Sequence, residues 1–62
     1  MTVIKVRKMV AAHAAMDRST PDKSDQAFAA MRTVFGRKDA SAFSRVYEAM
    51  GCDYKKLIEH YC

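Results

Sequence analysis

The stretch FSRVYEAMGCDYKKLIEHY, residues 43–61, decides the fold class because it holds two apolar patterns of helical period on either side of a glycine. Each set follows the i, i+3, i+4, i+7 spacing of one helix face: Phe43, Val46, Tyr47 and Met50, then Tyr54, Leu57, Ile58 and Tyr61. Gly51 is typical of a helix end, and Asp53 is a typical helix cap. We therefore predict two short helices, over about residues 40–50 and 54–61.

A third helix is indicated upstream by Thr20-Pro21-Asp22. Threonine caps exposed amides, proline is favoured at the first helical position, and an acid suits the positive end of the helix dipole. The apolar face of this helix has five members: Ala27, Phe28, Met31, Val34 and Phe35. Gly36 ends the pattern, which predicts a helix over 21–35. Residues 37–39 are then a linker, with Asp39 as the cap of the following helix.

The first part of the chain predicts a helix over about residues 3–16, with Thr2 as its cap. One face carries Val3, Val6, Val10, His13 and Ala14, with Met9 and Met16 at its margins. Ile4 falls outside this face. The segment TVIKV also alternates like a strand, so helix and strand both stay open for residues 2–6. A single strand would have no partner, which favours the helix.

The composition adds that the core of this all-α domain is thin. The 62 residues form one domain of three or four helices, 1–62, with ten alanines and a single leucine, Leu57. We expect the alanine-rich segments 11–15 and 27–31 to be contact stripes between the first two helices. A chain this short buries only about 60% of its unfolded surface. Small domains usually need a disulfide, a metal or a second subunit for stability.

Of these three aids, a second subunit is the one that the sequence favours. Cys52 and Cys62 would lie roughly 15 Å apart along a helix, too far for a disulfide, although Cys62 could link two chains. His13, Cys52, His60 and Cys62 lack the spacing of metal ligands. We therefore expect no metal and no cofactor, and we predict a homodimer.

The charge pattern bears on the class of partner. The net charge is +4 and the pI is about 9.3, which favours acidic partners. No glycine-rich phosphate loop and no nucleophile with a positioned base is evident, so we predict that the chain is not an enzyme. No apolar run reaches the roughly 18 residues of a membrane span. We expect no membrane association and a cytoplasmic location.

Residues 43–61 also resemble the helix-turn-helix family in outline. Gly51 stands at the turn, and Val46, Met50 and Leu57 occupy core positions of that motif. The chain departs from the family at Tyr47, where a small residue is preferred, and at His60, which replaces a core residue. The resemblance implies a small DNA-binding regulator. Its phosphate contacts would come from seven basic residues: Lys5, Arg7, Lys8, Arg37, Lys38, Lys55 and Lys56.

The exposed face of the last helix argues against this reading. Glu59 follows Lys55 and Lys56 at helical spacing and largely offsets their charge. A helix that reads bases usually offers several arginine, asparagine or glutamine side chains. We therefore treat DNA binding as the alternative hypothesis.

In size, compact helices and a basic, cysteine-ended chain, the protein is similar to short helical accessory proteins of lambdoid phages and prophages, encoded between the recombination and excision genes. No residue motif carries this resemblance, so it transfers no site residues. It implies a protein of the host cytoplasm that binds a host protein and modulates a host process or phage development. Our main prediction is thus a non-enzymatic protein-interaction module. Its predicted contact surface is on the first helix: Val6, Met9, Val10, His13 and Met16.

Overall fold

The protein is an all-helical domain, as the sequence predicted. The computed structural model describes residues 1–62 and contains four helices and no strand. In chain order the helices are α1 (Val3–Ala15), α2 (Pro21–Phe35), α3 (Arg37–Ala49) and α4 (Tyr54–Tyr61). The radius of gyration is 10.8 Å, close to the value of about 10.6 Å expected for a compact chain of this length.

Three of the predicted helix starts are confirmed by their caps. The side chains of Thr2, Thr20 and Asp53 each accept a hydrogen bond from the backbone N–H three residues later. Each bond satisfies one of the backbone donors that a helix leaves free in its first turn. Residues 2–6 therefore belong to a helix start and not to a strand. The end of α1 differs from the prediction by one residue, within the usual fraying of a helix end.

The junction between α2 and α3 differs from the prediction. We expected a linker over residues 37–39, but α3 begins at Arg37, directly after Gly36. The N–H of Gly36 donates to the carbonyl of Arg32 at the end of α2, and its own carbonyl accepts from Ala40 at the start of α3. Gly36 has φ 93° and ψ 148°, a conformation that is nearly confined to glycine. One residue therefore replaces the expected linker.

Asp39 consequently is not the cap of α3, and Gly36 provides no side-chain cap. Asp39 lies in the first turn of α3 and forms an ion pair with Lys5 of α1. The hydrogen bond from Lys5 lowers the pKa of Asp39. The ion pair connects the beginning of α1 to the beginning of α3.

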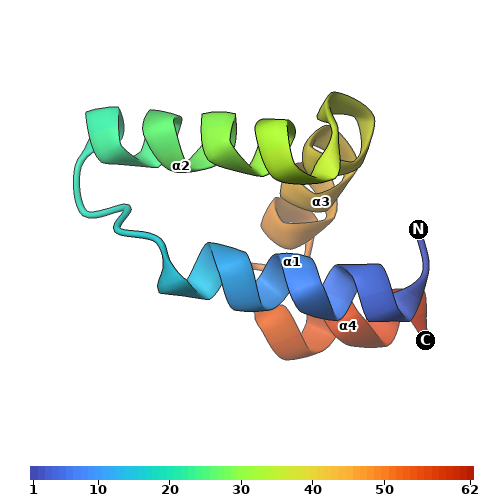
Figure 1. Ribbon diagram of the computed structural model, residues 1–62. Coiled ribbons are helices and arrows are strands. Elements are labelled where there is room, and N and C mark those ends of the chain that lie inside the picture. Colours follow the sequence, from blue (N-terminus) through green and yellow to red (C-terminus); the bar gives the residue numbers. More distant parts are fainter.

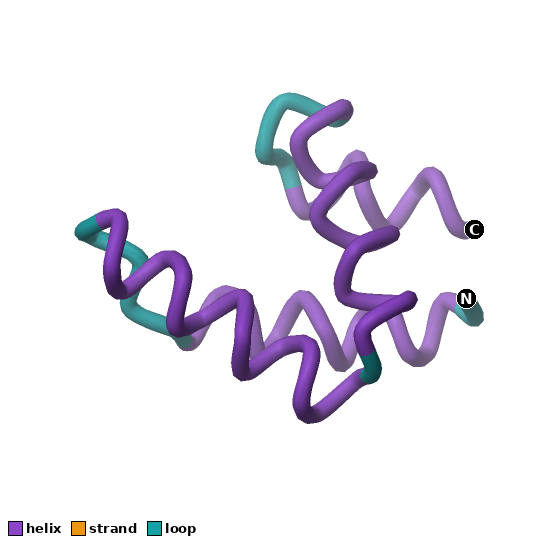
Figure 2. Tube along the Cα trace, turned by 90° about the horizontal axis from the view of Figure 1, so that it is seen from above, coloured by secondary structure: helices purple, strands orange, loops and turns teal.

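The most extensive helix contact is between α2 and α3, and α1 packs against both α4 and α2. Figure 1 shows α1 between α2 and α4, while α3 crosses behind. Both views bring the chain termini together at one end of the molecule (Figures 1 and 2). The buried core takes residues from all four helices: Val6, Met9, Ala27, Met31, Ala40, Phe43 and Leu57.

The first half of α2 lies outside this core. Every residue from Pro21 to Gln26 is exposed, and this end of α2 projects away from α3 (Figure 2). The first half of α2 therefore contributes little to the core, and a groove lies between it and the end of α1. None of the four helices has both the length and the apolar character that crossing a bilayer would require.

Candidate interaction site

The predicted contact surface on the first helix is mostly used inside the chain. Val6 and Met9 have no exposed area, and Val10 and His13 are half-buried against the core. Val6 and Met9 therefore cannot meet a partner while the domain stays folded, which corrects the prediction for these two residues. The packing of α1 on α4 and on the core covers this face. Of the five predicted residues, Met16 lies at the edge of an open groove.

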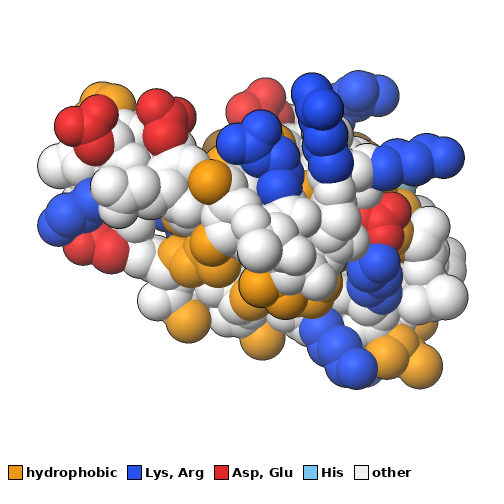
Figure 3. Space-filling model, turned by 45° about the horizontal axis from the view of Figure 1, so that its top comes forward, with side chains coloured by type: hydrophobic (Ala, Val, Ile, Leu, Met, Phe, Trp, Pro, Cys, Tyr) orange, Lys and Arg blue, Asp and Glu red, His pale blue; other side chains and the backbone are white.

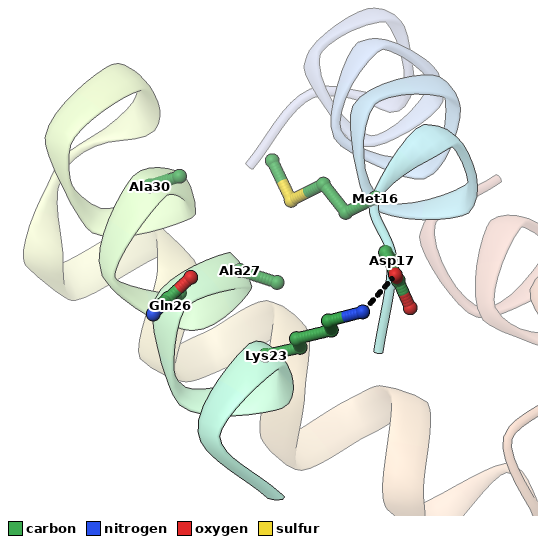
Figure 4. A pocket seen from close by; sticks show the side chains of 6 residues that line it. All are labelled: Met16, Asp17, Lys23, Gln26, Ala27 and Ala30. Atoms are coloured by element: carbon green, nitrogen blue, oxygen red, sulfur yellow. Dashed lines mark hydrogen bonds and ion pairs between the residues drawn. The ribbon is translucent and has the colours of Figure 1, made fainter. Parts of the chain in front are cut away.

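That groove lies between the end of α1 and the first half of α2. It has a volume of about 330 Å³ and six lining residues: Met16, Asp17, Lys23, Gln26, Ala27 and Ala30. Figure 4 shows the Met16 side chain extending from the end of α1 toward Ala27 and Ala30 on α2. An ion pair of 2.9 Å between Lys23 and Asp17 joins the two walls at one end. The apolar part of the lining therefore consists of Met16, Ala27 and Ala30.

The predicted contact stripe between the two alanine-rich segments is met only in part, because most of their alanines stay exposed. Ala12 is half-buried and Ala27 is buried, but Ala11, Ala15 and Ala30 remain exposed. The connecting segment between α1 and α2 separates the helix axes at this end (Figure 1). Alanine side chains are too short to fill the space, so it stays open.

Val34 extends the apolar wall of the groove along α2. It follows Ala30 by four residues, so the two side chains lie on the same side of the helix. Its exposed fraction is 70%, although the sequence placed it on the core face. Figure 3 shows that hydrophobic side chains are exposed on one face of the molecule and that most of the basic side chains on this face lie toward one end. The sequence could not predict the exposure of Val34, because this residue lies at the margin of the apolar stripe of α2.

A second cluster of side chains surrounds His13 at the junction of α1, α3 and α4. Nδ1 of His13 and the hydroxyl of Tyr54 are 2.5 Å apart in a hydrogen bond. Arg18 donates to the same hydroxyl at 3.1 Å. The imidazole also lies 5.3 Å from the Phe43 ring and 5.0 Å from the Tyr47 ring, centroid to centroid. His13 therefore lies at the edge of the core, and its contacts connect α1 with α3 and α4.

Arg18 is the member of this cluster that sequence reasoning missed. It follows the end of α1, in a segment with no periodic pattern, so nothing in the sequence singled it out. Burial lowers the pKa of His13, and the positive charge of Arg18 lowers it further. The imidazole is thus held neutral near pH 7, consistent with Nδ1 accepting the hydrogen bond from Tyr54.

We expect the domain to lose stability as the pH falls below about 6.5, the usual pKa of histidine. Because the folded-state pKa of His13 is lowered, the unfolded chain takes up a proton first. The loss begins near the unfolded-state pKa and is complete once the pH is below the folded-state pKa. The free energy of unfolding, measured with urea at pH 7.5 and at pH 5, gives the size of this loss.

The second histidine provides the matched control for this experiment. His13→Leu should flatten the pH dependence, whereas His60→Gln, at an exposed position, should leave it unchanged. The carboxylates of Asp17 and Asp39 do not interfere, because their lowered pKa values place their contributions in more acidic solution. Equal pH dependence in the His13→Leu variant and the parent chain would show that His13 does not cause the loss.

The structure places the basic residues of the alternative reading at two ends of α1. Lys5 is engaged in the ion pair with the first turn of α3. Lys55 and Lys56 follow Tyr54, which is hydrogen-bonded to His13 near the other end of α1. Lys5 and His13 are eight residues apart, roughly 12 Å along the helix. Arg37 and Lys38 begin α3, beside Lys5. DNA binding by these basic residues stays a prediction.

The exposed face of α4 is as predicted, with Lys55, Lys56, Glu59 and His60 all exposed. Cys52 and Cys62 are also exposed, and neither is in a disulfide. Cys62 is therefore accessible for a link between two chains. Searches of family models, of curated proteins and of solved structures found no match to this chain.

Proposed function

We propose that the protein is a non-enzymatic interaction module that binds a protein chain in the groove between α1 and α2. The observation that carries the proposal is the open apolar groove, continued along α2 by Val34, which is 70% exposed. Covering apolar surface contributes about 25 cal/mol per Å². A helix that laid its apolar face in this groove would gain that contribution, as in helix-in-groove recognition.

The chemistry of the groove supports recognition. Its two charged groups, Asp17 and Lys23, are paired with each other. The remaining lining consists of one amide side chain and apolar groups. Such a lining selects a partner by shape and apolar contact. In the setting that the phage resemblance implies, the partner would be a protein of the bacterial cytoplasm whose activity the module modulates.

The proposal is tested by placing a photo-reactive benzoylphenylalanine at Gln26, an exposed residue that lines the groove. We expect discrete cross-linked products in lysate of the producing cells. An excess of the unmodified chain should suppress them, and an excess of the Ala30→Glu chain should not, because the added carboxylate blocks the groove. Products with a second copy and with a different protein both count as contact at this site.

The matched control carries the same photo-reactive residue at Glu59, on the exposed face of α4. We expect no discrete product from this position. If Gln26 and Glu59 give the same products, or if the Ala30→Glu chain competes as well as the unmodified chain, the groove is not the contact surface.

A further inference from the structure

A second cavity lies where α2, α3 and the segment between α1 and α2 meet. Its volume is about 270 Å³, and none of its nine lining residues belongs to the groove between α1 and α2. Pockets for drug-sized ligands have volumes of roughly 300–1,000 Å³. The second cavity is therefore of a size for a smaller molecule.

Arg18 gives this cavity hydrogen-bond donors without protein partners. Its Nε is the one buried side-chain nitrogen or oxygen in the structure that has no hydrogen-bond partner. The guanidinium donates from Nη2 to the hydroxyl of Tyr54 at 3.1 Å, and it forms no ion pair. A guanidinium has five N–H donors and binds a carboxylate best through two of them. Arg18 can therefore hold the carboxylate of a ligand.

Two carboxylates line the same cavity, Asp25 on α2 and Glu48 on α3. Neither forms an ion pair with Arg18 or with any other base. Because the carboxylates repel a simple anion and the guanidinium repels a simple cation, a ligand with only one charge meets a like charge here. A molecule with a carboxylate and an ammonium group is complementary to both signs.

We propose that this cavity binds a free α-amino acid with an apolar side chain. Arg18 binds the carboxylate of the amino acid, and Asp25 and Glu48 attract its ammonium group. The half-buried rings of Phe28 and Tyr47, which also line the cavity, contact the apolar side chain. A peptide terminus carries only one of the two charges, so the free amino acid fits better.

The bound amino acid would connect three parts of the fold. Phe28 is on α2, Tyr47 is on α3, and Arg18 lies between α1 and α2. The first half of α2, from Pro21 to Gln26, is exposed throughout. Helical segments with few buried contacts open locally at low free energy. Binding should therefore slow amide hydrogen exchange in this half of α2.

Titration of the ¹⁵N-labelled chain with L-leucine and with L-phenylalanine, at about pH 7, tests the proposal. We expect saturable shifts of the amide resonances of Phe28 and Glu48. Two analogues of phenylalanine separate the charges: phenethylamine lacks the carboxylate, and 3-phenylpropionate lacks the ammonium group. Each should bind about tenfold or more weakly than phenylalanine, since each loses a charge-assisted contact.

Asp25→Asn and Glu48→Gln remove the negative charges at exposed positions and should weaken the binding of phenylalanine. Arg18→Gln should abolish it, but this change also removes the hydrogen bond to Tyr54. Circular dichroism therefore checks that each variant is folded. The matched controls are Arg45→Gln and Glu59→Gln, which change the same charges at exposed residues outside the cavity. Both should bind phenylalanine like the parent chain.

Three results would overturn the proposal. Without saturable shifts for either amino acid up to about 10 mM, the cavity holds water only. Equal binding of phenylalanine and phenethylamine would exclude Arg18 as the carboxylate site. Equal weakening in the cavity variants and the two controls would indicate a general effect of charge. None of these results bears on the proposed function, because the groove and the cavity have no residue in common.

Discussion

Replacement of Phe43 by alanine is expected to remove a large part of the protein's free energy of unfolding. Phe43 is 2% exposed and is the largest of the fully buried side chains. It contacts His13 and stacks on Tyr47 with ring centroids 6.0 Å apart. Removing a buried phenylalanine ring costs about 3–5 kcal/mol, from lost transfer free energy and from the cavity that remains.

The effect is large because the domain has little stability to lose. At roughly 0.05–0.15 kcal/mol per residue, a chain of this length has a free energy of unfolding of about 3–9 kcal/mol. The core that provides it has seven buried residues, two of which are alanines. The loss of one aromatic ring is therefore comparable with the total.

Far-ultraviolet circular dichroism during urea unfolding measures this effect. The matched control is Ile4→Ala, which also shortens an apolar side chain, but one that is 68% exposed. It should change the free energy of unfolding by no more than about 0.5 kcal/mol. Similar unfolding midpoints for Phe43→Ala and Ile4→Ala would contradict the position of the core.

Replacement of Gly36 by alanine is expected to cost about 1–3 kcal/mol, the usual strain of a residue held in a disfavoured backbone conformation. A Cβ at this position would meet no atom within 4 Å, so steric contact contributes nothing. The cost comes from φ 93° and ψ 148°, which residues with a side chain rarely adopt. Because Gly36 ends α2 and begins α3, relief of the strain would turn one helix away from the other.

Asparagine substitutions distinguish this strain from a general effect of losing glycine. Gly51 has φ 71°, in the left-handed region that asparagine tolerates. Gly51→Asn should therefore be milder than Gly51→Ala. Gly36→Asn should be no milder than Gly36→Ala, because ψ 148° lies outside the left-handed region. Thermal unfolding of the four variants measures both differences, and rescue by asparagine at Gly36 would contradict the geometry of this junction.

The candidate site was the part of the structure least accessible to prediction. Met16 was named from the sequence, but Ala30 and Val34 were assigned to a helix contact and to the core. Their exposure depends on the distance between α1 and α2, which the unpatterned segment 16–20 sets. The ion pair of Lys5 with Asp39 likewise joins residues 34 positions apart, and no local pattern indicates it.

The sequence by itself determined the helices. Thr2, Thr20 and Asp53 cap them, and Gly36 and Gly51 end them, because capping and chain reversal depend on the chemistry of a few consecutive residues. Only the tertiary structure decided which part of each apolar stripe is buried. The apolar stripe of α1 was read as centred near Val6 and Val10 with Met9 at its margin, yet Met9 is fully buried and Ala14 is exposed. Periodicity defines a stripe wider than the contact, and the neighbouring helices select the part that is covered and the part that remains open.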